Sequence, residues 1–409
     1  MFEVIDNKKQ EALIKVVGVG GCGNNAVDYM IEKNIDGVDF ISVNTDLQSL
    51  KKSQANNIVQ IGLQLTKGLG SGARPDSGKQ AAIEDKEKLV ESIKDADMLF
   101  ITAGMGGGTG TGAAPVIAEI AKELGILTVA VVTKPFSFEG KRNQIAEEGL
   151  KELRNFVDSL IVIPNEKLMN VLGADVTFIN AFSAANEVLY NSVSGISDII
   201  NHTGLINVDF SDVKTVMAEM GSAIIGSGIF EGDNRAVKAA QLAINSPLLE
   251  NIELKNAKGI LVNISASSSF KMKEYVDVMN EVKSITARDA TVIVGNVIDD
   301  ELDNKIKVTI VATGLDDNYI SDIQDHLAVP DKEVVDYDQL SDNSNTQNEI
   351  KKSENNDSDF SNVFFDGGDE SNLVDSDAVA EDEYDIPSFL RRNKWYFKKL
   401  FQKRYQSKV

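Results

Sequence analysis

Short apolar runs alternate with longer amphipathic stretches between residues 13 and 164, and this alternation constrains the fold more than any other feature of the sequence. Apolar runs of this length are typical of strands buried on both faces of a parallel sheet. With helices between them, they predict a doubly wound α/β domain. The expected strands are Leu13–Val19, Phe40–Val43, Met98–Thr102, Ile126–Thr133 and Leu160–Ile163, and the main expected helices are Asn25–Lys33, Gly78–Ile93, Pro115–Leu124 and Arg142–Phe156.

The pattern changes after residue 175, which we take as the end of the first domain, 1–175. Residues 176–202 contain neither proline nor a pair of glycines, which predicts one long connecting helix. Residues 203–316 are predicted to form a second, smaller α/β domain with a mixed sheet. Its expected strands are Gly221–Phe230, Gly259–Ser265, Ala290–Val297 and Lys307–Thr313, and its expected helices are Arg235–Ile244 and Lys271–Ser284.

The last part of the chain loses this periodicity. Residues 317–383 are rich in Ser, Asn and Asp, and residues 331–383 hold 17 acidic residues against three lysines. This composition predicts a disordered acidic linker. Residues 384–409 are apolar and basic again, with eight Lys and Arg from Arg391 onward. An apolar, basic end on a solvated linker predicts a partner-binding peptide.

Composition also limits the partners and the compartment. The net charge of −22 argues against nucleic acid as a partner of the main body, because such a field repels phosphate backbones. The one cysteine, Cys22, excludes an internal disulfide and fits a reducing compartment. The first thirty residues lack the features of a signal peptide, and no apolar run is long enough to span a bilayer. We expect a soluble cytoplasmic protein.

The first glycine-rich loop follows the first expected strand. Gly18-Val19-Gly20-Gly21-Cys22-Gly23 has the G-x-G-x-x-G pattern, in which glycines let the backbone close on a phosphate at a helix N-terminus. Alone this motif is weak, because a tight turn without ligand or a dinucleotide-binding enzyme would also fit it. A dinucleotide enzyme, a Rossmann-type oxidoreductase, would need an acidic residue near Asn44-Thr45, where Asp46 comes slightly late.

The second loop, Gly104 to Gly112, has six glycines in nine residues directly after another expected strand. Consecutive free N–H groups at a helix start form an anion-binding nest. A purely structural role is hard to justify, since each glycine costs about 1 kcal/mol of ordering relative to alanine. Two phosphate loops on one sheet fit a nucleoside triphosphate. The Walker pattern is absent, because Gly72 to Gln80 has the wrong spacing and no Ser or Thr at its end.

The run Gly106-Gly107-Gly108-Thr109-Gly110-Thr111-Gly112 resembles the tubulin signature, and residues 12–315 resemble the FtsZ family of bacterial tubulin-like division GTPases. Val43–Asp46, Pro135–Gly140 and Asn207–Phe210 carry the resemblance further. It implies a GTP-binding domain in 1–175 and an activation or polymerisation domain in 203–316. It also implies binding of GTP and GDP, Mg²⁺ bound mainly through the nucleotide, and homopolymers that form a division ring.

The resemblance implies these nucleotide contacts. Phosphates would be held by the residues of the two loops, namely Gly20, Gly21, Cys22, Gly23, Asn24, Asn25, Gly106, Gly107, Gly108, Thr109 and Gly110. Glu139 would contact the ribose, while Phe182 and Asn186 would bind guanine. Glu139-Gly140-Lys141-Arg142 is one residue shorter than the usual Glu-Gly-x-x-Arg, so that either Arg142 or Asn143 takes the arginine position, and we favour Arg142.

Asn207, Asp209 and Asp212 are the candidate hydrolysis residues. Without the resemblance, Asp209 or Asp212 is equally well explained as the N-cap of a helix that begins near Phe210, which stabilises it by about 1 kcal/mol. The resemblance implies that this loop lies opposite the nucleotide and completes the active site of a neighbouring subunit, so that assembly and hydrolysis are coupled. A non-hydrolysing scaffold, or a tubulin-like relative with another cargo, remains the alternative.

The C-terminal end resembles a family peptide as well. Asp385–Arg392 looks like the segment with which FtsZ proteins reach membrane tethers and regulators. The extension Asn393–Val409 interleaves aromatic residues with Lys and Arg, and could lie on anionic lipid as a basic amphipathic helix or serve only as a basic tail. These features imply a cytoplasmic protein at the midcell division site, on the inner face of the membrane.

Overall fold

The computed structural model describes residues 12–315 apart from 174–175, 203, 205–207, 219–220, 247, 250–253 and 288–289. All of these residues belong to the first of two compact units, Met1–Val334. The predicted linker 317–383 and the predicted peptide 384–409 lie outside the described residues, as does Asn207.

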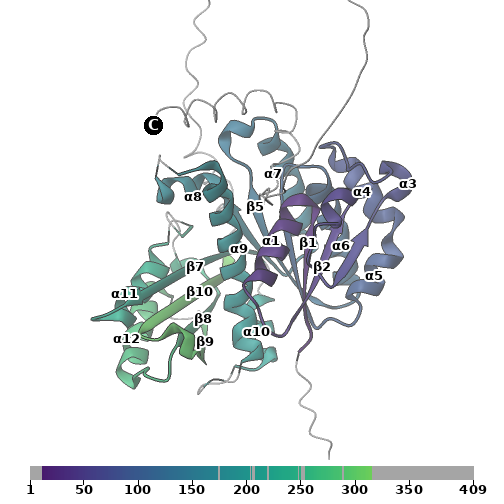
Figure 1. Ribbon diagram of the computed structural model, residues 1–409. Helices are drawn as coiled ribbons and strands as arrows, with labels where there is room; N and C mark the ends of the chain where they lie inside the picture. The colour runs from purple at the N-terminus through teal and green to yellow at the C-terminus, as the bar shows by residue number, and fades with distance from the viewer. Residues whose placement is uncertain are drawn as a thin grey trace, which may run out of the picture. The chain divides into compact units, whose positions relative to one another are not determined.

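The first half of the fold is a parallel sheet in the order β3-β2-β1-β4-β5-β6 (Figure 1). All five predicted strands are present, so the doubly wound fold class is confirmed. The short strand β3 was not predicted, because four residues with polar ends give no clear pattern. The strands are β1 (Ile14–Val19), β2 (Val38–Asn44), β3 (Asn57–Gln60), β4 (Met98–Gly104), β5 (Leu127–Lys134) and β6 (Ser159–Pro164).

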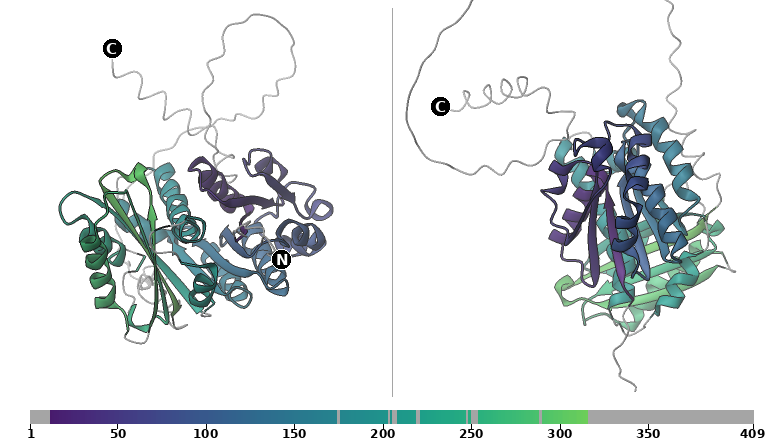
Figure 2. Two further views of the ribbon diagram at one scale, coloured as in Figure 1. Left: turned by 90° about the horizontal axis from the view of Figure 1, so that it is seen from below. Right: turned by 90° about the vertical axis from the view of Figure 1, so that its right-hand side faces the viewer.

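Helices cover both faces of this sheet (Figure 2). Side chains of α1 (Gly20–Glu32) and α9 (Phe178–Asn201) pack on one face. The other face packs against α4 (Pro75–Glu84), α5 (Lys86–Ile93), α6 (Thr109–Glu123) and α7 (Arg142–Arg154). The short helices are α2 (Leu47–Leu50), α3 (Leu63–Thr66), η1 (Ser137–Glu139) and α8 (Asn165–Leu172).

Three helix predictions need correction. The stretch Gly78–Ile93 is not one helix, because Asp85 separates α4 from α5 and its carboxylate accepts a hydrogen bond from the backbone N of Gly62 at 2.7 Å. Helices α1 and α6 begin at Gly20 and Thr109, several residues before the expected starts. The glycine loops therefore run directly into the first helical turns. The sequence does not predict these turns as helix, because glycine has a low helix propensity.

The second half of the fold is a mixed sheet, as predicted, but it is joined to the first. Three residues of β6 pair in parallel with Gly221–Ala223 of β7, which makes one ten-stranded sheet. β10 pairs antiparallel with both β7 and β8, and β9 pairs in parallel with β8. The elements are α10 (Phe210–Met217), β7 (Gly221–Glu231), α11 (Arg235–Ile244), η2 (Leu254–Asn256), β8 (Gly259–Ala266), α12 (Met272–Ile285), β9 (Thr291–Ile298), η3 (Asp300–Leu302) and β10 (Lys305–Leu315).

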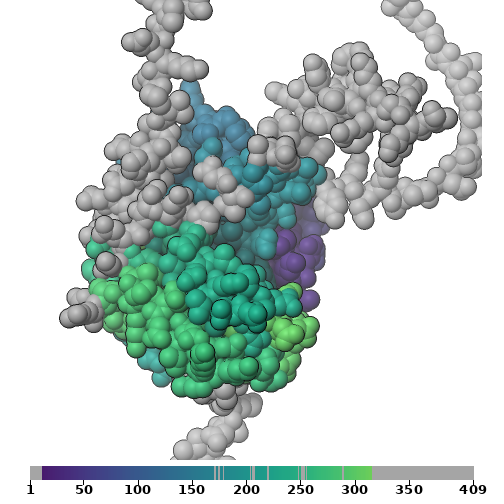
Figure 3. All heavy atoms as spheres, turned by 90° about the vertical axis from the view of Figure 1, so that its left-hand side faces the viewer, coloured from purple at the N-terminus to yellow at the C-terminus, as the bar shows by residue number. Residues whose placement is uncertain are grey.

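Helix α9 is the expected connecting helix, and it contacts both halves. Its 24 residues span about 36 Å at 1.5 Å per residue. Tyr190 lies edge-on to Tyr29 of α1, with ring centroids 6.2 Å apart. On the other side, Asn263 of β8 donates a hydrogen bond to the Gly195 carbonyl oxygen at 3.1 Å. The residues that follow α9, drawn in green, gather in the lower part of the face shown in Figure 3.

Asp198 on α9 makes the stability of the folded protein depend on pH. Burial raises its pKa to about 6, and nearby Lys307 and His202 limit the rise. Because the folded-state pKa exceeds the ordinary value of 3.8, the folded protein holds an extra proton between those two values. Stability therefore falls as pH rises from about 4 to about 6, and the cost is complete above pH 6.

We expect Asp198→Asn to stabilise the protein at pH 8 by about 1–2 kcal/mol. The gain stays below the full value of the shift because Lys307, whose own pKa is lowered by burial, loses an attractive neighbour. Urea unfolding at pH 8 and pH 5 measures it, and the gain should shrink at the lower pH. Asp39→Asn, at an exposed position on β2, is the control. An equal gain at both pH values would contradict the explanation.

Candidate nucleotide and hydrolysis site

The two glycine-rich loops meet at the carboxyl edge of the parallel sheet. A Cβ atom at Gly20 would lie 2.9 Å from the backbone nitrogen of Gly110, so the starts of α1 and α6 are in direct backbone contact. Gly20 also has φ of +74°, a conformation that favours glycine. Two helix N-termini thus converge on one point, and their free N–H groups and dipoles favour an anion there.

The glycines of these loops have two different roles. Side chains at Gly108 and Gly112 would collide with Ser71 and with the Pro75 carbonyl oxygen, and one at Gly110 would lie 2.7 Å from the Gly104 carbonyl oxygen. Gly21 and Gly107 have nothing within 4 Å and face open space. The sequence argument that structure could not account for so many glycines was therefore wrong, because close packing accounts for several of them.

Two expected phosphate contacts have side chains that brace the loops. The Thr109 hydroxyl lies 2.7 Å from that of Thr45 and 3.0 Å from that of Ser71. The buried Asn24 side chain donates to the Gly18 carbonyl oxygen at 3.0 Å and accepts from Asn44 Nδ2 at 2.7 Å. These side chains hold the loops in shape, while Cys22 and Asn25 are exposed beside them.

The two candidates for the arginine position make different contacts. Arg142 Nη1 donates to Glu139 Oε2 at 2.8 Å, and the ideal Cβ of Gly106 lies 3.1 Å from Arg142 Cβ. Asn143 instead donates from Nδ2 to the Phe136 carbonyl oxygen at 3.1 Å, which fastens its helix to the preceding loop. The geometry favours Arg142 over Asn143 as a nucleotide contact.

Three aromatic side chains lie close together near the start of α9. The Phe182 ring stands nearly perpendicular to that of Phe136, with centroids 5.6 Å apart, and Phe138 stacks on Phe136 at 5.1 Å. Phe182 and Asn186 are partly exposed and one helical turn apart, so they share a face of α9. A planar base could stack on Phe182 while the Asn186 amide pairs with its edge.

Asn165 is a site candidate that the sequence reading missed. It opens α8 directly after β6, at the same carboxyl edge, and only 6% of its surface is exposed. Its Oδ1 atom is buried without a hydrogen-bond partner. A buried acceptor without a partner is costly, which makes Asn165 a candidate for contact with a hydrogen-bond donor of a ligand. No motif marked this residue, because its role depends on the arrangement of strands.

The acidic residues lie at the opposite edge of the sheet. Ser159, the first residue of β6, donates from its hydroxyl to the Met217 carbonyl oxygen of α10 at 2.7 Å. Asp209 is the N-cap of α10 and accepts from the backbone N of Asp212 at 2.9 Å, so the capping interpretation is confirmed. Both aspartates are exposed. Within one chain, the length of α9 separates them from Phe182.

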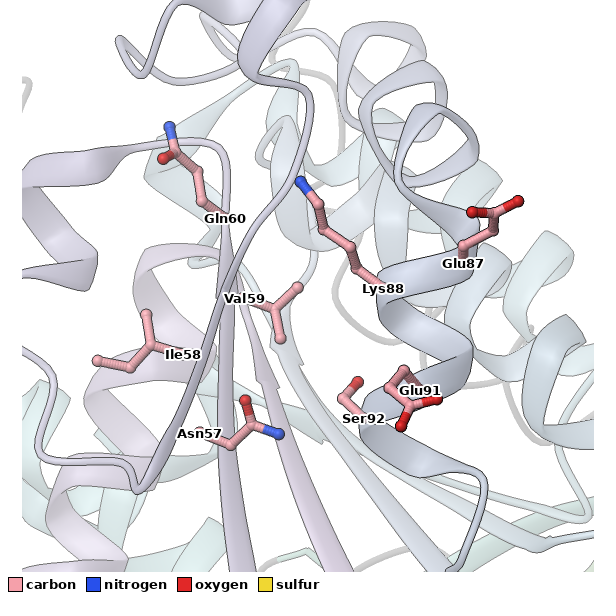
Figure 4. A pocket seen from close by; sticks show the side chains of 8 residues that line it. All are labelled: Asn57, Ile58, Val59, Gln60, Glu87, Lys88, Glu91 and Ser92. Carbon is pink, nitrogen blue, oxygen red and sulfur yellow. The ribbon is translucent and has the colours of Figure 1, made fainter.

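The described residues also contain a hollow that lies apart from the glycine loops. An open hollow lies between the edge strand β3 and α5, where Val59 points toward α5 and Ile58 points away (Figure 4). It shares no residue with the glycine loops. Among the described residues, no group of three or more His, Cys, Asp or Glu could hold a metal ion. No helix in this part of the chain is long and apolar enough to cross a membrane.

A doubly wound sheet with two glycine-rich helix starts, a long central helix and a mixed second sheet defines a tubulin-like GTPase. Residues 13–173 match the Tubulin/FtsZ family GTPase domain, and residues 221–316 match the FtsZ family C-terminal domain. The cell division protein FtsZ of Pseudomonas aeruginosa is 57% identical over 316 residues, 77% of this chain and 80% of that protein. The chain belongs to the FtsZ family.

Further comparisons agree with this assignment. The FtsZ of Buchnera aphidicola subsp. Schizaphis graminum is 48% identical over 403 residues, which cover 96% of this chain and 99% of that protein. An FtsZ dimer of M. jannaschii matches with a TM-score of 0.72 and 44% identity, over 75% of this chain and 89% of that chain. A protofilament of CetZ2 from Haloferax volcanii, at 19% identity and a TM-score of 0.65, shares the fold.

The protein is therefore a GTP-binding, GTP-hydrolysing cell-division protein that assembles into filaments of the division ring. The resemblance seen in the sequence is confirmed. The oxidoreductase alternative is wrong, because the second glycine loop and the C-terminal domain both belong to the FtsZ family.

The two roles of the glycines can be separated by alanine substitution. Gly112→Ala should lower the free energy of unfolding by about 1–3 kcal/mol, because the methyl group collides with the Pro75 carbonyl oxygen. Gly21→Ala should leave unfolding of the nucleotide-free protein nearly unchanged but weaken GDP binding, since its methyl group projects into the open space. Urea unfolding and titration with a fluorescent GDP analogue measure the two effects. Equal destabilisation by both variants would refute the distinction.

Proposed function

We propose that GTP is hydrolysed between two subunits, with the nucleotide bound by one and the acidic residues supplied by the next. The observation that carries this proposal is the placement of the glycine loops and of Asp209 and Asp212 at opposite edges of one sheet. A single chain cannot bring these groups together, whereas head-to-tail stacking can. Such a contact does not close on itself and generates open filaments.

The nucleotide-binding half would work as follows. The N–H groups at Gly20–Asn25 and Gly106–Gly110 would hold the phosphates, with Gly21 and Gly107 allowing the closest approach. Glu139 and Arg142 would contact the ribose end. Phe182 would stack on guanine, and the amides of Asn186 and Asn165 would pair with its edge. We assign these roles from three observations: some loop glycines face open space, Arg142 is paired with Glu139, and the buried Asn165 oxygen lacks a partner.

The loops also fit a nucleotide that brings its own metal ion. They present N–H groups and hydroxyls, and the carboxylate of Glu139 is paired with Arg142. Mg²⁺ would therefore be held mainly by phosphate oxygens and would neutralise charge on the phosphates when bound. The residues of this chain would bind and orient the phosphates, and they would exclude water from the space around them.

The neighbouring subunit would supply Asn207, Asp209 and Asp212. One carboxylate oxygen of Asp209 caps α10, which fixes that side chain in place. Asp212 is exposed in the first turn of the same helix and can accept a hydrogen bond from a water molecule aligned with the γ-phosphate. The amide of Asn207 would orient the same water. After hydrolysis, contacts to the γ-phosphate are lost and the interface weakens.

The rest of the chain would place the filament at the membrane. We propose the division 1–175 for the GTP-binding domain, 176–202 for the connecting helix and 203–316 for the polymerisation domain, although the two sheets are hydrogen-bonded together. The acidic linker 317–383 would carry Asp385–Arg392 to membrane tethers and regulators. Asn393–Val409 would add contact with anionic lipid. The protein would thus act in the cytoplasm at midcell.

We expect GTPase activity per subunit to rise with protein concentration, because stacking completes the site. Asp212→Ala should lower turnover at least about 100-fold while leaving nucleotide affinity within about twofold. Phosphate release and binding of a fluorescent GDP analogue measure these effects. Glu119→Ala, an exposed acid on α6, is the matched control and should behave as the wild type. Full activity of Asp212→Ala, or a rate independent of concentration, would refute the shared site.

Removing residues 393–409 should reduce binding of the full chain to anionic vesicles without changing its GTPase rate. The extension carries no acidic residue, so its attraction to anionic lipid should also fall steeply with salt. Flotation with phosphatidylserine vesicles and with neutral phosphatidylcholine vesicles, at low and high salt, measures the difference. Equal flotation of the full chain and the truncated chain would show that the extension is only a basic tail.

A further inference from the structure

Helix α7 carries Arg142 as its first residue, and its start is not held by a cap. Lys141, the residue before it, makes no side-chain hydrogen bond to the helix. Two side chains one turn apart on α7 hold this end instead. Asn143 donates to the Phe136 carbonyl oxygen at 3.1 Å, and Glu147 forms an ion pair with Lys134. Both contacts reach the strand and loop that precede the helix.

The backbone of Lys134 is held in place by the sheet, so its ion pair with Glu147 has a fixed starting point. It is the last residue of β5, which is hydrogen-bonded on both sides, with Thr133 beside Gly104 of β4 and Lys134 beside Pro164 of β6. The Lys134 and Glu147 side chains are only 13% and 19% exposed. Loss of one partner from so sheltered a pair leaves the other charge poorly solvated, which is strongly unfavourable.

The same pair lies next to the ribose end of the site. Pro135, the residue after Lys134, has its Cγ atom 2.9 Å from the ideal Cβ of Gly106, and Arg142 is in contact with that same glycine. A shift of α7 away from β5 would therefore move Arg142 from Gly106 and from Glu139. The ion pair thus helps to fix the distance of Arg142 from Gly106 and from Glu139 at the ribose end of the proposed site.

We propose that Lys134 is a positioning residue whose ion pair with Glu147 holds α7 so that Arg142 and Glu139 meet the nucleotide. This inference rests on the proposed roles of Arg142 and Glu139. Lys134 itself need not touch the nucleotide. Its effect should appear in binding rather than in turnover, because the acidic residues of the neighbouring subunit are not connected to α7.

The same helix offers a matched control. Glu152, further along α7, pairs with Lys79 of α4 at 2.5 Å, and these two side chains are 42% and 38% exposed. This pair joins α7 to another helix and lies away from Arg142. Removing this pair therefore measures the general effect on nucleotide binding of losing an ion pair on α7.

The test compares Lys134→Met, Glu147→Gln, their double variant, Lys79→Met and Arg142→Ala in the full chain. Affinity for a fluorescent GDP analogue is measured at concentrations where sedimentation shows no assembly. KM and kcat for GTP are measured under assembly, and melting temperatures are recorded. We expect Lys134→Met and Glu147→Gln each to weaken binding and raise KM about tenfold, with kcat within about twofold. The double variant should be no worse than either single one, and Lys79→Met should bind as the wild type does.

Three results would overturn the inference. The first is normal binding by Lys134→Met and Glu147→Gln while Arg142→Ala is weakened, which leaves the proposed role of Arg142 intact. The second is an equal loss in Lys79→Met, which would mean general destabilisation of α7. The third is normal binding by Arg142→Ala, which would remove the role of Arg142 together with the reason to position it. If Lys134→Met does not fold, Glu147→Gln alone decides between these outcomes.

Discussion

The contact between the first turns of α1 and α6 is the constraint on which the rest of this structure depends. At Gly20 the two backbones approach so closely that the Cβ atom of any other residue would lie 2.9 Å from the backbone nitrogen of Gly110. Both helices consequently aim their N-termini at the same point on the carboxyl edge of the sheet. Helix starts carry N–H groups that the helix itself cannot satisfy. The convergence of the two helix starts is therefore a direct result of how the two helices pack, and the side chains of Asn24 and Thr109 help to keep that packing in place.

The sequence predicted the order of strands and helices well, because buried strands and amphipathic helices have distinct periods. It failed where the local pattern and the tertiary packing disagree. Glycines at the starts of α1 and α6 suggest a loop by propensity, yet close packing makes them helical. Asp85 gave no sign of dividing one helix into two, since its partner is the backbone of Gly62. The short pairing of β6 with β7 that merges the two sheets also has no signature in the sequence.

The candidate site shows the same limit on a smaller scale. Motifs located both loops, Glu139 and the aspartates, but they could not say which glycines face open space and which face a neighbouring backbone. That distinction depends on Ser71 and Pro75, which lie outside the loop itself. Arg142 and Asn143 are adjacent, and the sequence favours Arg142 only through the resemblance, whereas the structure shows that they contact different partners, Glu139 and the Phe136 carbonyl oxygen. Asn165 became visible solely because its buried oxygen lacks a partner.

Helix α9 relates the two ends of the subunit to each other. Phe182 and Asn186 lie near its start, and the chain leads from its end to the helix that carries Asp212. Because a helix is stiff along its axis, a displacement at the Phe182 end of α9 would be carried toward its other end. The Gly195 carbonyl oxygen, which accepts a hydrogen bond from Asn263, also ties α9 to the second part of the sheet. In the proposed shared site, a subunit built in this way would report the state of its own nucleotide at the surface that supplies its neighbour with Asp209 and Asp212.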